Sequence, residues 1–168
     1  MIQMLLRFVF LLFLTTLVSG KHDFEHTHSG DLICRRCGAL ITKASAVLEY
    51  QQLPQSPNSV FSYNMSVVGV DTTINVLDNP SGYRFHVMAV NGADLKFHGE
   101  YHSSDTWYPG YRWIICTCKT CNQHAGWYFE KVKQPDSPKN FVGIVLDSVI
   151  SADAKSYFSP GSLCFYFF

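Results

Sequence analysis

Four cysteines are arranged as two C-x-x-C pairs, Cys34 with Cys37 and Cys118 with Cys121. A two-residue spacer lets one turn present both sulfur atoms to a single ion at about 2.3 Å, so two such turns suit a tetrahedral four-thiolate zinc site. A disulfide framework is the alternative in an oxidising compartment. Local disulfides within each pair would be strained, and the spacing therefore favours structural Zn²⁺.

The second chemistry is aromatic, because all 3 tryptophans of the chain, Trp107, Trp113 and Trp127, fall within residues 105–129. Trp113 starts a strand pattern that runs to the second cysteine pair, and Trp127 starts the next one. We expect this hairpin to bring Trp113 and Trp127 side by side, with Trp107 arriving from the preceding loop. Three indoles around one space predict a small-molecule pocket, although a single tryptophan is more often core and aromatic pockets also bind cations.

Several ordered motifs resemble the CULT domain, the thalidomide-binding domain of cereblon. The resemblance covers about residues 31–150 and rests on both cysteine pairs and on four segments. These segments are WYPGYRW at 107–113, HAGWYF at 124–129, NPSGY at 79–83 and SPKNFVG at 137–143.

The resemblance implies an all-β fold, the β-tent, in which two antiparallel sheets are pinned by a structural zinc. It implies that the zinc ligands are Cys34, Cys37, Cys118 and Cys121. It further implies a three-tryptophan cage for cyclic imides such as glutarimides, hydantoins and uracil-like rings, or for modified peptide ends. The implied ligand-binding residues are Asn79, Pro80, Asp105, Trp107, Trp113, Trp127 and Phe129.

One position departs from the family pattern. Where cereblon has a histidine whose backbone bonds the imide, two residues before the first cage tryptophan, this chain has Asp105. A backbone contact survives a side-chain change, so we expect binding to persist, with a carboxylate at the rim that can alter ligand preference. From the residues alone, Asn79 and Pro80 only shape a turn.

The N-terminal residues predict a secretory signal peptide at 1–20. An apolar run from Phe8 to Val18 precedes small residues at a plausible cleavage site, and it is shorter than the roughly 20 residues that a membrane anchor needs. We then expect a polar leader at 21–30, the CULT domain at 31–150 and a C-terminal tail at 151–168. The mature protein is predicted to be secreted, with no membrane association after cleavage.

Composition narrows the partners further. The 168 residues carry a formal net charge of +0, with 47% hydrophobic and 15% charged residues, which excludes a basic footprint for nucleic acid. In a secreted chain, Asn64 is a glycosylation acceptor within Asn-Met-Ser, and its alternation with Phe61 to Met65 places it toward solvent. Cys116 and Cys164 could pair as a disulfide.

Alternation and turn residues predict a long β-meander with few helix signals. The expected strands are 60–70, 72–77, 83–90, 95–101 and 141–146. Asn91-Gly92 is a hairpin signal that joins the third of these to the fourth.

The function expected from these features is a zinc-containing binding module rather than an enzyme, with the oligomeric state left open. One alternative is an interaction domain in which zinc and aromatic rings only stabilise the fold. The other is an enzyme like the methionine sulfoxide reductases, which share the double C-x-x-C site. Such an enzyme needs a nucleophilic thiolate, for which Cys116 is the candidate beside the cage.

Overall fold

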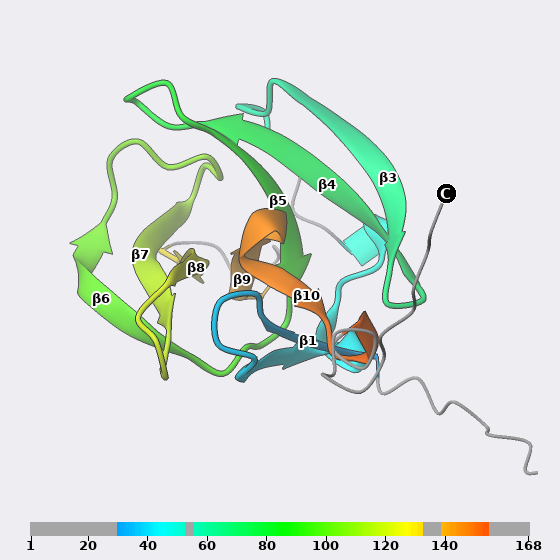
Figure 1. Cartoon of the computed structure of the whole chain (residues 1–168). Helices are drawn as coiled ribbons and strands as arrows, with labels where there is room; N and C mark the ends of the chain where they lie inside the picture. Colours follow the sequence, from blue (N-terminus) through cyan, green and yellow to red (C-terminus); the bar gives the residue numbers. More distant parts are fainter. Residues whose placement is uncertain (1–29, 53–55, 133–138, 155–168) are drawn as a thin grey trace, which may run out of the picture.

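The computed structural model describes residues 30–52, 56–132 and 139–154. These residues form an all-β domain (Figure 1). The strands are β1 Asp31–Cys34, β2 Leu40–Lys43, β3 Phe61–Val67, β4 Val70–Asp78, β5 Arg84–Val90, β6 Leu95–His102, β7 Tyr111–Cys118, β8 His124–Lys131, β9 Phe141–Val145 and β10 Val149–Ser151. Three single 3-10 turns, at Ala44–Ala46, Tyr50–Gln52 and Leu146–Ser148, complete the described elements. Within these ranges, no helix has the length and apolar character to cross a membrane.

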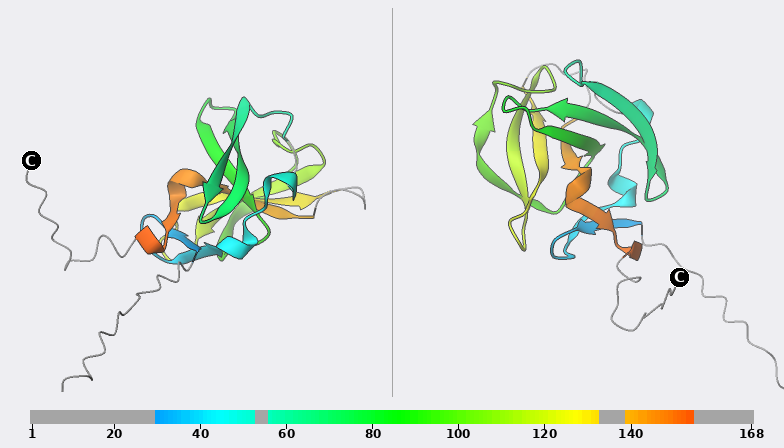
Figure 2. Two further views of the ribbon diagram at one scale, coloured as in Figure 1. Left: turned by 90° about the vertical axis from the view of Figure 1, so that its right-hand side faces the viewer. Right: turned by 45° about the horizontal axis from the view of Figure 1, so that its top comes forward.

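The strands build two antiparallel sheets, as expected. The small sheet has the order β10-β1-β2, and the large one has the order β3-β4-β5-β9-β8-β7-β6. The large sheet thus has two wings, β3 to β5 and β6 to β8, on either side of β9, and the small sheet lies beside one end of it (Figures 1 and 2). The two wings and the small sheet give the arrangement expected of a β-tent.

The predicted β-meander holds from β3 to β5, but its last step, the hairpin at Asn91-Gly92, is wrong. A turn does follow β5, but β5 pairs with β4 and β9, while β6 pairs with β7 at the far edge of the sheet. Burial explains this order. Every residue of β9 is buried, which requires a central position, whereas β6 is exposed from Lys96 to His102 and suits an edge.

The expected strand at 60–70 ends at Val67, and the next strand, expected at 72–77, already begins at Val70. Val68 and Gly69 have φ values of 46° and 83° and form the tight turn between β3 and β4. Asn64 is exposed, as its alternation indicated, but Phe61 and Met65 on the other face of β3 are exposed as well. β3 is the second edge of the large sheet, so its outer end covers little of the core.

Two hydrophobic clusters fill the interior. The first lies between the two sheets and includes Leu32, Ile41, Met88 and Ile144. The second lies on the opposite face of the large sheet, where Tyr108, Phe129 and Phe141 pack with ring centroids 4.8 to 5.0 Å apart. This aromatic cluster forms the base on which the candidate site is built.

Some sequence predictions fall outside the described residues. These are the signal peptide at 1–20, almost all of the leader at 21–30, Cys164 and the tail from residue 155. At the C-terminal end of the expected domain, Ser151 pairs with Leu32 in β10, so the last described strand includes the first residue of the expected tail.

The close approach of β8 and β9 yields a stability prediction. Gly126 has φ +153°, and a Cβ there would overlap the carbonyl oxygen of Gly143. We expect Gly126→Ala to destabilise the domain by about 3 kcal/mol or more, because backbone atoms must move. Urea unfolding measures this, with Gly92→Ala as control because nothing lies within 4 Å of a Cβ at that position. A Gly126→Ala protein as stable as the Gly92→Ala control would contradict the close approach of the two strands at this position.

Candidate functional site

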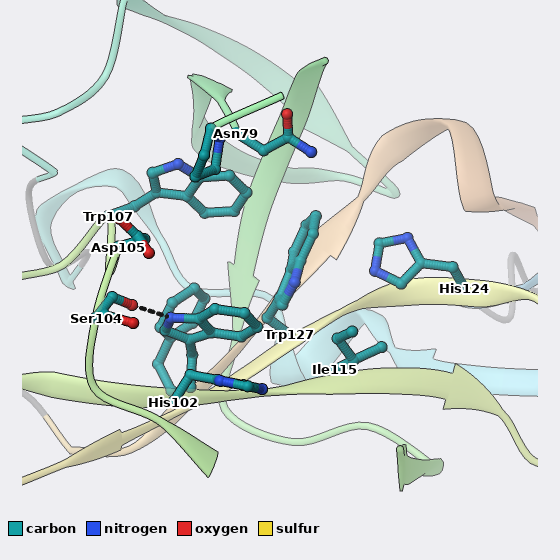
Figure 3. A pocket seen from close by; sticks show the side chains of 11 residues that line it. Asn79, His102, Ser104, Asp105, Trp107, Ile115, His124 and Trp127 are labelled. Atoms are coloured by element: carbon teal, nitrogen blue, oxygen red, sulfur yellow. Dashed lines mark hydrogen bonds between the residues drawn. The ribbon is translucent and has the colours of Figure 1, made fainter. Parts of the chain in front are cut away.

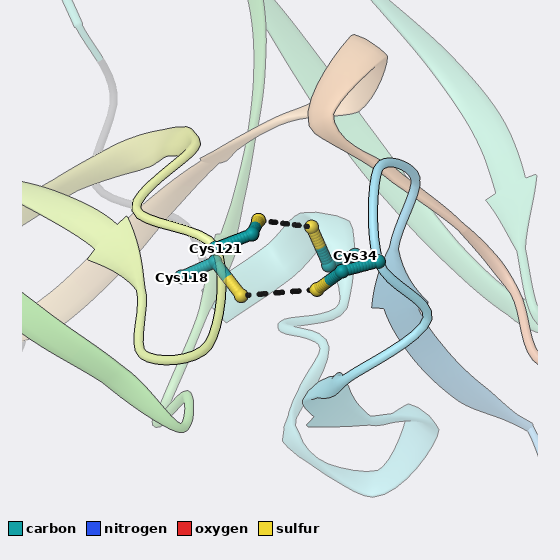
Figure 4. Close-up of side chains that lie close together, drawn as sticks. Cys34, Cys118 and Cys121 are labelled. Atoms are coloured by element: carbon teal, nitrogen blue, oxygen red, sulfur yellow. Dashed lines mark hydrogen bonds between the residues drawn. The ribbon is translucent and has the colours of Figure 1, made fainter.

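The four paired cysteines converge on one point, where the small sheet meets the large one. Their Sγ atoms all lie within 4.8 Å of one another. Two Sγ to Sγ distances, Cys34 to Cys121 and Cys37 to Cys118, are 3.6 Å (Figure 4). None of the four forms a disulfide. In a tetrahedral site with metal–sulfur bonds of 2.3 Å, the sulfur atoms would lie about 3.8 Å apart, so the cluster fits a metal ion.

The two turns that carry these cysteines have the same backbone design. In each, the residue four positions after the first cysteine has positive φ, 74° at Gly38 and 61° at Asn122. The N–H of that residue donates to the carbonyl of the first cysteine, at 2.8 Å in one turn and 3.0 Å in the other. The N–H of the first cysteine in each turn donates to the carbonyl oxygen of the residue five positions later, which is Ala39 in one turn and Gln123 in the other. The two C-x-x-C motifs of the sequence thus form the same local backbone structure.

The electrostatics of the cluster favour a thiolate on the second turn. Burial raises the pKa of Cys118, but hydrogen bonds from the backbone N–H groups of Cys121 and Thr120, together with those from the thiols of Cys37 and Cys121, outweigh this and lower it to about 7. A thiol that is half ionised near neutral pH is ready to bind a metal, because the thiolate is the ligand.

A pocket of about 500 Å³ lies between the wings of the large sheet (Figure 3). All seven residues that the resemblance implied, Asn79, Pro80, Asp105, Trp107, Trp113, Trp127 and Phe129, line it. The structure adds His102, Ser104, Ile115 and His124, which the prediction missed. Strand alternation could have grouped Ile115 with Trp113, and Trp127 with Phe129, because every second residue of a strand points to the same face.

The three tryptophans come from three different segments. Trp113 on β7 and Trp127 on β8 share a face but are diagonal neighbours, because Trp113 is paired with Phe129 and Ile115 with Trp127. The sequence predicted that these two rings lie directly side by side, whereas the structure places them diagonally. Trp107 arrives from the loop between β6 and β7, and its ring meets that of Trp127 edge on at 4.7 Å and 83°.

Hydrogen bonds hold two of the indoles. Trp107 Nε1 donates to the carbonyl of Asp78 at 2.8 Å, and Trp113 Nε1 donates to the carbonyl of Ser104 at 2.9 Å. The imidazole of His102 stacks on Trp113 with centroids 4.6 Å apart. These contacts fix the planes of the rings before any ligand is present.

The base of the pocket is more deeply buried than its mouth. Trp127 is only 8% exposed and Phe129 only 1%, and both belong to the aromatic cluster of the core. The expectation that a tryptophan is core is thus partly right for Trp127. His124 packs edge on against Trp127 at 4.5 Å, and burial lowers its pKa, which keeps the imidazole neutral.

The turn between β4 and β5 closes one side of the pocket. The Asn79 side-chain oxygen accepts hydrogen bonds from the N–H groups of Ser81 and Tyr83, at 3.0 and 2.9 Å. Asn79 therefore shapes this turn, as its residue type indicated, and it also lines the pocket.

Cys116 lies on the other face of β7 and does not reach the pocket. It is fully buried, with its Sγ 3.8 Å from the carbonyl oxygen of Ile114. Burial raises its pKa to about 12, so the neutral thiol is the stable form.

Comparisons with known proteins agree with the geometry. No family model matches the chain. Curated relatives named protein cereblon are similar to it: the Danio rerio protein is 32% identical over 119 residues, which is 70% of this chain and 26% of the relative. The Drosophila melanogaster protein is 37% identical over 98 residues, which is 56% of this chain and 16% of the relative. The Gallus gallus protein is 34% identical over 73 residues, which is 43% of this chain and 16% of the relative.

This chain thus spans about a quarter or less of the length of these relatives. The similarity accompanies an all-β fold of two antiparallel sheets and a four-cysteine cluster that fits a metal ion. We conclude that the chain belongs to the cereblon-type CULT domain family.

Proposed function

We propose that this protein is a secreted, zinc-stabilised binding module that takes cyclic imides, or peptide ends that carry such a ring, in the pocket of Figure 3. The observation that carries the proposal is the convergence of Trp107, Trp113 and Trp127 on one cavity of about 500 Å³. Flat apolar walls with a few polar groups are typical of sites for small ring compounds.

The polar groups around the pocket suit an imide edge. An imide presents an N–H between two carbonyl groups, and it therefore needs one acceptor and two donors. Among the described residues, the Asn79 side-chain nitrogen and Trp127 Nε1 make no hydrogen bond, so both are available as donors. The backbone around Asp105 supplies the acceptor in the proposed complex.

Zinc is the ion that we propose for the cysteine cluster. Four thiolates in a closed tetrahedral set are typical of structural zinc, and such a site has no open position for a substrate. The ion would join the turn after β1 to the turn after β7, and so tie the small sheet to the wing that carries Trp113.

Secretion is part of the proposal and rests on the sequence of residues 1–20. Asn64 supports it in one respect, since it is exposed on the edge strand β3. Its side-chain oxygen accepts a hydrogen bond from Thr73 at 2.7 Å, which leaves the amide nitrogen for the glycan link.

The alternative interaction domain is favoured by one feature, an exposed aromatic group on the face of β6 to β8 opposite the pocket. Phe97 is 54% exposed and stacks on Tyr128 at 5.2 Å. The reductase alternative gains no support, because Cys116 is buried as a neutral thiol away from the pocket. Because the candidate nucleophile Cys116 does not reach the pocket, we propose binding rather than catalysis.

The pocket is tested by titrating the protein with glutarimide while tryptophan fluorescence is recorded. We expect saturable quenching with glutarimide and none with N-methylglutarimide, since the methyl group removes the N–H donor. Trp113→Ala should weaken binding at least tenfold, because one wall and the hydrogen bond to Ser104 are lost, while Trp107 and Trp127 still report the ligand.

Phe97→Ala is the matched control for that variant, because Phe97 is an exposed aromatic residue on the opposite face of the sheet. It should bind as wild type. A folded wild-type protein that shows no response to glutarimide would favour the interaction domain instead.

The metal site is tested by Cys118→Ser. We expect this variant to lose zinc and to unfold, because structural zinc contributes folding free energy on the order of 10 kcal/mol in small domains. Elemental analysis and circular dichroism measure both effects. Cys116→Ser should keep one zinc per chain, and a folded Cys118→Ser protein that retains its metal would refute the proposed ligand set.

A further inference from the structure

The lining of the pocket carries a negative formal charge that no positive charge balances. Of the 11 residues that line it, Asp105 is the only one with a formal charge at neutral pH when histidine is counted as neutral, and no lysine or arginine is among them. Figure 3 shows Asp105 near Ser104 and Trp107, across the cavity from His124.

The loop that carries Asp105 is held at several points. The carbonyl of Ser104 accepts from Trp113, and the carbonyl of Trp107 accepts from Ser56 Oγ at 2.7 Å. Asn58 donates to the carbonyl of Thr106 at 3.2 Å. Asp105 itself has φ +54°, a left-handed conformation that aspartate and asparagine tolerate better than most residues. The carboxylate is therefore set at a defined place on the rim.

No neighbouring cation neutralises this carboxylate. Asp105 forms no ion pair or hydrogen bond with any residue in the ranges that the structure describes. Arg84 at the start of β5 is paired with Asp78 at 2.8 Å, and Arg112 on the opposite face of β7 is paired with Glu130. An unpaired charge beside low-dielectric aromatic walls produces a negative potential at the mouth of the pocket.

We propose that Asp105 makes the pocket selective for cyclic imides whose projecting substituent carries an ammonium group, and that it disfavours those that carry a carboxylate. This inference rests on the proposed function. The ring occupies the space between the tryptophans, and its substituent leaves through the mouth past Asp105. A cation there is attracted by the carboxylate and also by the faces of the aromatic rings at the rim. For a peptide end, the same chemistry favours a basic group next to the cyclised residue.

The test uses three glutarimides acylated on a 3-amino group, with chains of equal length that end in ammonium, methyl or carboxylate. They are the 3-aminopropanoyl, butanoyl and 3-carboxypropanoyl derivatives, titrated by fluorescence in dilute buffer at neutral pH. We expect wild type to bind the ammonium probe about tenfold more tightly than the carboxylate probe, with the methyl probe between them, as for partly exposed charges. Raising the salt concentration should narrow this ratio.

Asp105→Asn is the decisive variant, because asparagine keeps the shape and accepts the positive φ. We expect its ratio between the ammonium and carboxylate probes to fall to about one. Asp71→Asn is the matched control, since it removes the same charge from an exposed site on β4 that does not line the pocket. It should keep the wild-type ratio.

The outcomes separate the two proposals. If the methyl probe binds wild type but the three probes bind equally, or if their order persists in Asp105→Asn, the role of Asp105 is overturned while imide binding stands. If folded wild-type protein binds none of the three probes, the proposed function fails, and the inference fails with it.

Discussion

The convergence of four sulfur atoms at the junction of the two sheets is the constraint on which the rest of the structure depends. Cys34 ends β1 and Cys118 ends β7, so a single metal ion at this point would join two hairpins whose first cysteines are 84 residues apart in the sequence (118 − 34). β7 and β8 form the second of these hairpins, and they also carry Trp113, Trp127 and Phe129. The cysteine cluster and the pocket therefore share one pair of strands, with the second cysteine pair at one end and the aromatic rings further along.

The pocket continues from the core rather than being added to it. Phe129 and Trp127 belong to the aromatic cluster that packs one face of the large sheet, and the pocket begins where this cluster reaches solvent. The indoles of Trp107 and Trp113 are oriented by hydrogen bonds to backbone carbonyls. Walls that are already ordered lose little conformational entropy when a ligand binds, which favours affinity from a small contact area.

The rim differs from the base in both exposure and chemistry. Its polar residues, Ser104, Asp105 and Asn79, come from two loops on different wings of the large sheet. Loops that are positioned by a rigid scaffold are where binding specificity commonly resides. The base can thus set the class of ring that enters, while the rim sets which substituents are accepted.

The sequence alone determined features that depend on local spacing. Two C-x-x-C turns and the alternation of the strands predicted the cysteine cluster and the all-β class, and the clustering of tryptophans predicted three residues of the pocket. The other four, Asn79, Pro80, Asp105 and Phe129, followed only from the resemblance to the CULT domain. Tertiary structure alone decided the strand order, because the turn at Asn91-Gly92 specifies a change of direction but not a pairing partner. It also brought His102 and His124 to the pocket, since their positions depend on how β6 and β8 pair with β7, and such long-range pairing is set by burial of the whole sheet rather than by neighbouring residues.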